Sequence, residues 1–328
     1  MNDTPPDVLE LAAEREKEAK KRFSEPALLA DELHKKIRLR RFAGPASLVG
    51  RLNPIRVAHL TDLHVGRVTP MKIQHAAVAL ANAESPDLVL LTGDFVCHSQ
   101  DYLDALEEVV RGFHVPVYAV LGNHDHWSGA VEVRRALVRA GATMLDNATT
   151  IIEVKGSRLQ LVGLDDAYTS HADRHRALRG MTPGLPTVGL SHIAEEADAL
   201  WAEGVELVLS GHTHGGQVTL AGLHELALGR MAGHRYVHGL YGTRAAAERV
   251  GAVYVGAGIG SAVMPLRLGE RGKREVTIFD LGVGPGSFEE HHQEQDPLPG
   301  RKPSPKTVAK RAMAVLKKRK RREKKAEK

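Results

Sequence analysis

Short apolar runs alternate with helical patterns through the middle of the chain. Nine runs of aliphatic and β-branched residues have the length of buried strands: 55–60, 88–91, 115–121, 151–154, 159–164, 187–190, 207–209, 252–255 and 276–279. Between the early runs, apolar residues recur every three or four positions, which predicts helices over 71–83, 102–111 and 130–140. Strands that alternate with helices favour a layered α/β fold.

The first part of the chain, residues 1–50, is charged and is predicted to be a helical extension. Within residues 26–43, Leu29, Leu33 and Ile37 recur at helical spacing among Lys and Arg. Two interpretations stay open. The helix either packs on the domain that follows, or forms a basic amphipathic element that lies on an anionic membrane surface.

The last part, residues 285–328, differs from the body in charge. Residues 301–328 carry 14 Lys and Arg against 2 Asp and Glu, a net charge of +12, so the other 300 residues carry −7 of the total of +5. Such a segment buries too little apolar surface to fold alone, and we expect a basic, disordered tail. Attraction to anionic lipid is an alternative. Non-specific nucleic-acid contact is a weaker one, because the tail has no aromatic residue for base stacking. The predicted domain between extension and tail spans residues 51–284.

Composition narrows the class of protein. Cys97 is the only cysteine in 328 residues, which excludes an intrachain disulfide, and we expect it to be a small buried hydrophobe. No apolar run is long enough to span a bilayer. The first residues lack the basic and apolar regions of a secretory signal. We therefore expect a cytoplasmic protein, which its basic ends could attach peripherally to the inner face of the membrane.

Five short polar segments directly follow apolar runs and carry metal-ligand side chains. They are Asp62-Leu63-His64, Gly93-Asp94, Gly122-Asn123-His124-Asp125, Ser191-His192 and Gly211-His212-Thr213-His214. Ligands collect at the carboxyl ends of strands in layered α/β folds, so these segments are expected to form one site. Carboxylate, amide and imidazole donors without thiolate suit Mn, Fe or Zn. Two such ions can clamp the attacking and leaving oxygens of a phosphoryl displacement.

The spacing within two of these segments allows two side chains of one segment to bind the same metal ion. Asp62 and His64 are two residues apart, so on an extended segment they point the same way. His212 and His214 have the same spacing. The two oxygens of one carboxylate at Asp94 are able to bridge two metals.

In this order, the five segments resemble the motif series of the calcineurin-like metallophosphoesterases over roughly residues 53–282. Residues 91–96, 122–127 and 209–217 further resemble the bacterial YkuE-like subgroup. The resemblance implies a four-layer α/β/β/α sandwich of two mixed β-sheets flanked by helices. It also implies hydrolysis of a phosphoester or pyrophosphate bond by a hydroxide held between two divalent metal ions.

The resemblance also implies a role for each site residue. The first metal is held by Asp62, His64 and His214, the second by Asn123, His192 and His212, and Asp94 bridges both. His124 acts on the substrate phosphate as general acid or electrostatic stabiliser, and Asp125 orients it.

Two stretches depart from the family pattern. Cys97-His98 replaces an acidic residue that many relatives carry near this position, and Ile193-Ala194-Glu195-Glu196 replaces the Asn-Pro-Asp that often follows the histidine. The second departure predicts a different substrate-facing loop.

The substrate stays open. The subgroup resembles enzymes that act on lipids such as UDP-diacylglucosamine, and the basic ends fit a membrane-associated nucleotide-sugar lipid. One alternative is a soluble nucleotide phosphodiesterase or nuclease with the same site. The other is a non-catalytic metal-binding scaffold, against which the complete set of seven ligands and His124 argues.

Overall fold

The computed structural model describes residues 36–97, 99–216, 233–245, 251–262, 267, 269–291, 293–298, 300, 309 and 313. The expectations for residues 1–35, for His98 and for nearly all of the basic tail lie outside the described residues.

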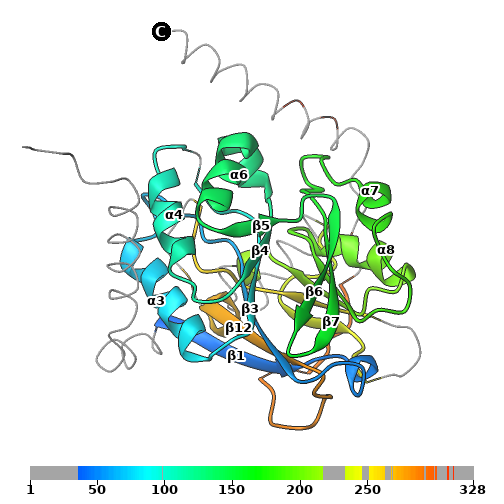
Figure 1. Ribbon diagram of the computed structural model, residues 1–328. Helices are drawn as coiled ribbons and strands as arrows, with labels where there is room; N and C mark the ends of the chain where they lie inside the picture. The colour runs from blue at the N-terminus through cyan, green and yellow to red at the C-terminus, as the bar shows by residue number, and fades with distance from the viewer. Residues whose placement is uncertain are drawn as a thin grey trace, which may run out of the picture.

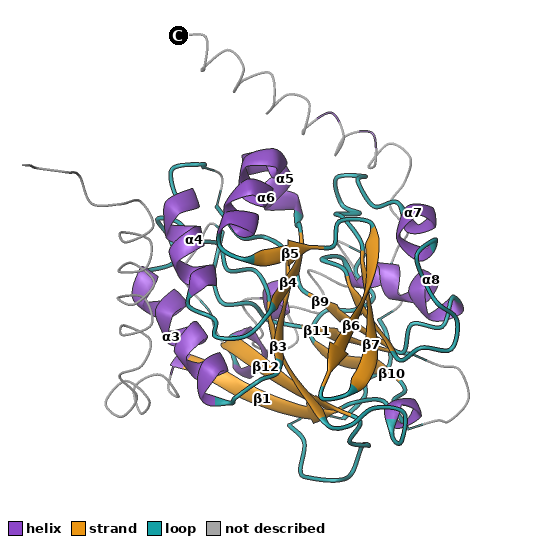
Figure 2. Ribbon diagram, viewed as in Figure 1, coloured by secondary structure: helices purple, strands orange, loops and turns teal. Residues whose placement is uncertain are grey.

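Two six-stranded sheets stack face to face (Figure 2). The first has the order β1 (Ile37–Ala43), β12 (Arg274–Leu281), β2 (Ile55–Leu60), β3 (Leu88–Thr92), β4 (Val117–Val120), β5 (Ala142–Met144). The second has the order β10 (Gly239–Gly242), β11 (Ala252–Val255), β9 (Leu207–Ser210), β8 (Thr187–Leu190), β7 (Ser157–Gly163), β6 (Ala148–Val154). Both are mixed, because β12 runs antiparallel to β2, and the edge strands β6 and β10 run antiparallel to their neighbours.

Helices cover the outer face of each sheet (Figure 1). Those on the first sheet are α3 (Met71–Ala83), α4 (Leu103–Arg111) and α6 (Ala130–Arg139), and those on the second are α7 (Arg174–Leu178) and α8 (Ala197–Ala202). The period-two pattern of β3 shows how the layers form: Val89 and Leu91 join the apolar cluster under the helices, whereas Leu88 and Leu90 join the cluster between the sheets. The predicted four-layer α/β/β/α architecture is confirmed.

The five polar segments occupy the positions that the sequence predicts. They follow the carboxyl ends of β2, β3, β4, β8 and β9, and α5 (Asn123–Ser128) begins directly after β4. Because β2, β3 and β4 are mutually parallel, as are β8 and β9, each sheet presents its segments at one edge.

The prediction of a helix across residues 26–43 is wrong for residues 37–43, which form β1 and pair in parallel with β12. Ile37 packs under the helices and Phe42 packs between the sheets, as alternation along a strand requires. Arg40 is 3% exposed and pairs with Glu275 at 2.5 Å, so this basic residue does not face a membrane.

Part of the expected tail is also ordered. The buried Arg244 donates to Glu290 and Glu294 at 2.8 and 2.7 Å and to the Ala43 carbonyl at 2.8 Å, and Gln295 N–H donates to the Leu240 carbonyl at 2.9 Å. The prediction of disorder from residue 285 onward is therefore wrong for these positions. The domain limits at 50 and 284 stay predictions.

Within the described ranges, no helix combines the length and the apolar character needed to cross a bilayer.

Candidate metal centre

The loops bring the predicted ligands together in two groups. One group is Asp62, His64 and His214, and the other is Asp94, His192 and His212; the ligand atoms within each lie within 4.8 Å of one another. Asn123, the first residue of α5, is 2% exposed, and its Oδ1 has no hydrogen-bond partner among the described residues.

In the first group, one oxygen of Asp62 is fixed and the other faces the imidazoles. Asp62 Oδ2 accepts from Thr61 Oγ1 at 2.8 Å and from His212 N–H at 3.0 Å. Asp62 Oδ1 lies 3.4 Å from His214 Nε2, which lies 3.1 Å from His64 Nε2. Three donor atoms at these separations match the spacing of ligands about 2.0–2.2 Å from one ion.

In the second group, His192 is oriented by the main chain. Its Nδ1–H donates to the Thr92 carbonyl at 2.7 Å, which leaves Nε2 to face Asp94 Oδ2 at 3.3 Å. A carbonyl on the far nitrogen is the usual way in which a metal-ligating imidazole is held in one tautomer. Within the described part of the chain, His212 Nδ1 has no hydrogen-bond partner either.

Asp94 belongs to the second group and also faces the first. Its Oδ1 accepts from His124 N–H at 2.7 Å, and its Oδ2 lies 3.6 Å from His64 Nε2 and 3.3 Å from His192 Nε2. A single carboxylate oxygen therefore faces both groups.

The backbone at the site is strained. Asp62, His64, Asp94, His212 and His214 all have positive φ, between 42° and 76°, and they make up five of the nine non-glycine residues in this conformation within the described ranges. Strain of this kind costs of order 1–3 kcal/mol per residue and concentrates at functional sites.

Two glycines allow the loops to approach each other closely. A Cβ on Gly122 would lie 2.4 Å from Asp94 Oδ1, and one on Gly211 would lie 2.0 Å from Thr61 Oγ1. No other residue type fits at these positions without moving the ligand loops.

Electrostatics at the site favour bound cations. Burial lowers the pKa of His64 to about 3 and the pKa values of His212 and His214 well below 6.5, which leaves these imidazoles neutral, as ligands must be. Against the effect of burial, Asp94 raises the pKa of His192 to about 10. The centre thus attracts positive charge, and Asp62 Oδ1, Asn123 Oδ1 and His192 Nε2 are buried there without a hydrogen-bond partner among the described residues. Its donor set fits two divalent metal ions.

His124 lies beside the first group. Its ring centroid is 4.8 Å from that of His64, at an interplanar angle of 86°, and 4.8 Å from that of Trp127. The hydrogen bonds of Asp125 run to main-chain N–H groups of Phe95, Val96 and Gly122, at 2.8, 3.3 and 2.9 Å. Asp125 therefore contacts the main chain at the start of α5 and in the loop after β3.

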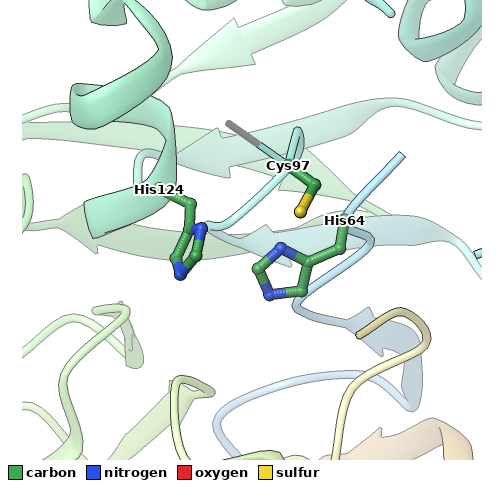
Figure 3. Close-up of side chains that lie close together, drawn as sticks. All are labelled: His64, Cys97 and His124. Carbon is green, nitrogen blue, oxygen red and sulfur yellow. The ribbon is translucent and has the colours of Figure 1, made fainter. Parts of the chain in front are cut away.

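Sequence reasoning missed several residues at the centre. Cys97, expected to be buried, is half-buried beside His64 and His124 (Figure 3), and its thiol donates to the Ala262 carbonyl at 2.9 Å. The Arg267 guanidinium lies 3.1 Å from His214 Nδ1. The sequence signal at Cys97 is that many relatives carry an acidic residue near this position. No motif surrounds Arg267.

Comparison with known proteins agrees with this geometry. Residues 55–216 match the family described as calcineurin-like phosphoesterase. The chain is 32% identical over 234 residues to "Phosphodiesterase YaeI" of Escherichia coli (strain K12), covering 70% of this chain and 82% of that protein. It is 28% identical over 232 residues to "Uncharacterized metallophosphoesterase YkuE" of Bacillus subtilis (strain 168), covering 69% and 78%. The chain therefore belongs to the calcineurin-like metallophosphoesterases, a family of metal-dependent phosphoesterases with a dinuclear metal site.

Proposed function

We propose that this protein hydrolyses a phosphoester bond at a centre of two divalent metal ions. Asp62, His64 and His214 would hold the first ion, Asn123, His192 and His212 would hold the second, and Asp94 would bridge them. The observation that carries this proposal is the position of Asp94 Oδ2, 3.6 and 3.3 Å from imidazole nitrogens of the two groups. When bound, such a pair lowers the pKa of a shared water and polarises phosphoryl oxygens.

The protein's own residues orient the reaction. The His124 N–H fixes Asp94 Oδ1, so that Oδ2 stays aimed between the groups. The His124 ring, beside the first group, stabilises the phosphoryl oxygens and donates a proton to the leaving oxygen. Asp125 holds the start of α5 against the loop after β3, which fixes the distance from His124 to the centre.

A phosphodiester is the substrate class with the most support, because the relative from Escherichia coli that is 32% identical is named a phosphodiesterase. Phosphomonoesters and pyrophosphates are the alternatives that an assay panel separates.

The first test joins metal content to turnover. We expect the purified protein to contain two divalent metal ions per chain and to hydrolyse bis-p-nitrophenyl phosphate with added Mn²⁺. Chelation should abolish turnover, because Asp94 and the imidazoles cannot activate water without the ions, and added Mn²⁺ should restore it. Elemental analysis of the same sample identifies the resident metal among Mn, Fe and Zn. Stoichiometric metal without turnover of any phosphoester would favour the scaffold instead.

We also propose that the protein works from the cytoplasm at an anionic membrane surface, where a nucleotide-sugar lipid is a fitting substrate. The support is the net charge of +12 in residues 301–328, nearly all outside the described residues. Each Lys or Arg near such a surface adds about 1 kcal/mol.

Flotation tests the membrane proposal. The full chain should float with phosphatidylserine vesicles at low salt and not with phosphatidylcholine vesicles, and added salt should release it. Deletion of residues 301–328 should abolish flotation. If the shortened chain floats as well as the full one, the tail does not attach the protein.

A further inference from the structure

Two aromatic side chains border the candidate metal centre. Trp127 lies on α5 with its ring centroid 4.8 Å from that of His124. Tyr168 lies in the loop after β7, with its ring centroid 6.0 Å from that of Trp127 and 5.1 Å from that of His212. Trp127 and Tyr168, together termed the aromatic arc, therefore run from the proposed acid to a ligand of the second group.

The aromatic arc does not belong to the core. Neither ring is part of the three apolar clusters that the described residues form, and both are half-buried. By contrast, Phe42, Tyr254 and Phe279 are 0% exposed between the sheets. Packing of the core thus does not explain why two large rings lie at the rim of the centre.

The loop that carries Tyr168 is polar, and it borders a hollow of about 560 Å³. Its lining is Ala167, Ser170, His171, Ala172, Asp173, Arg174 and Glu196, and Arg174 pairs with Glu196 at 2.6 and 2.8 Å. Neither Trp127 nor Tyr168 is among the lining residues, so the hollow shows that the loop beside the aromatic arc is polar but is not part of the arc.

We propose that the aromatic arc is a stacking subsite for the nucleobase of a nucleoside-containing phosphoester, an inference that rests on the proposed function. Stacking on aromatic side chains tolerates every base, because each has a π-face, and its loss weakens binding by about 5- to 140-fold per base.

The competing explanation is that Trp127 and Tyr168 only support His124 and His212. If the rings only support these histidines, their loss lowers the turnover of every substrate equally, whether or not the substrate carries a base. Stacking discriminates between ligands with and without one.

The experiment compares two competitive inhibitors of bis-p-nitrophenyl phosphate hydrolysis. Adenosine 5′-monophosphate and ribose 5-phosphate carry the same phosphate on a ribose, and only the first has a base. We expect the wild-type protein to bind the adenosine compound at least about fivefold more tightly. Trp127→Leu and Tyr168→Leu should each bring the ratio of the two inhibition constants towards one, whereas Trp127→Phe and Tyr168→Phe should keep most of it. A wild-type ratio near one, or a ratio that both Leu variants leave unchanged, overturns the subsite.

Fluorescence provides a readout that does not need turnover. The chain has 2 tryptophans, Trp127 and Trp201, and Trp201 lies on α8 with its Nε1–H bonded to the Ala252 carbonyl at 3.2 Å. In Trp201→Phe, adenosine 5′-monophosphate should quench the remaining emission, and ribose 5-phosphate should not. Trp127→Phe is the matched control and should show no quenching. If the wild-type protein hydrolyses no phosphoester and Trp127 is nevertheless quenched, the proposed function fails and the subsite stands. If it hydrolyses phosphoesters and Trp127 is not quenched, the subsite fails and the proposed function stands.

Discussion

Asp94→Asn should remove most of the hydrolytic activity and lower the metal content of the purified protein. The amide keeps the shape of the side chain but loses the charge that both groups share, because Asp94 Oδ2 is 3.6 and 3.3 Å from their imidazole nitrogens. Asp62 would then be the one carboxylate among the proposed ligands. We expect kcat/KM to fall by roughly 10²–10³-fold, measured with bis-p-nitrophenyl phosphate beside elemental analysis.

Two further variants make this result specific. Asp104→Asn is the same substitution at an exposed position in the first turn of α4, and it should change neither quantity. His124→Gln should lower kcat by about 10²–10⁴-fold, as loss of a general acid does, while both metals remain. Near-normal turnover of Asp94→Asn with two metals per chain would show that the bridging assignment is wrong.

The parts of the fold that the sequence predicts well are those whose signal is local. α3 ends at the predicted residues, as do β2, β8 and β11, because their apolar pattern and flanking turns lie within a dozen residues. β1 has no such signal. Its helical spacing is overridden by pairing with β12, more than 230 positions later in the chain, where Leu39 lies opposite Val276.

The site residues also differ in how far local sequence predicts them. Two pairs can be predicted because the two residues of each pair lie within one short loop: Asp62 with His64, and His212 with His214. Trp127 lies on α5, at the end of a stretch that resembles the subgroup, but that resemblance assigns it no role. Tyr168 lies 41 positions later, in the loop after β7, and has no motif of its own. Asp125 is recognisable as a site residue, but its main-chain partners depend on how α5 docks against the loop after β3.

Glu275→Gln should destabilise the protein by about 3–5 kcal/mol, since it leaves a buried cation without its counter-ion. Glu275 is 2% exposed; its Oε2 accepts from Arg40 at 2.5 Å and from His238 at 3.0 Å, and its Oε1 accepts from Tyr254 at 2.8 Å. Against the effect of burial, His238 and Arg40 hold the pKa of Glu275 below its usual 4.5. The midpoint of urea unfolding at pH 7 measures the loss.

The pH dependence of that loss has a definite sign. A carboxyl whose pKa is depressed in the folded state stabilises the protein above the pKa of the unfolded state, and this stabilisation is lost as the pH falls through the folded value. The difference between wild-type and Glu275→Gln should therefore be constant above about pH 5 and shrink below the unfolded-state value of 4.5. A difference that grows on acidification would contradict the ion-pair account.

Glu275 also connects the stability of the sheets to the metal centre. Its Oε1 accepts from Ala257 N–H at 2.8 Å, and the next residues of that loop, Ile259 and Gly260, donate to the carbonyls of Thr61 and Asp62 at 3.1 and 2.7 Å. Glu275→Gln should therefore lose metal affinity below the temperature at which it unfolds. The matched control is Glu153→Gln on the exposed side of β6, which should change stability by no more than about 0.5 kcal/mol. If Glu275→Gln is as stable as the wild-type protein, the buried network only offsets its own desolvation. The loop that holds Asp62 is then fixed by its main-chain hydrogen bonds alone.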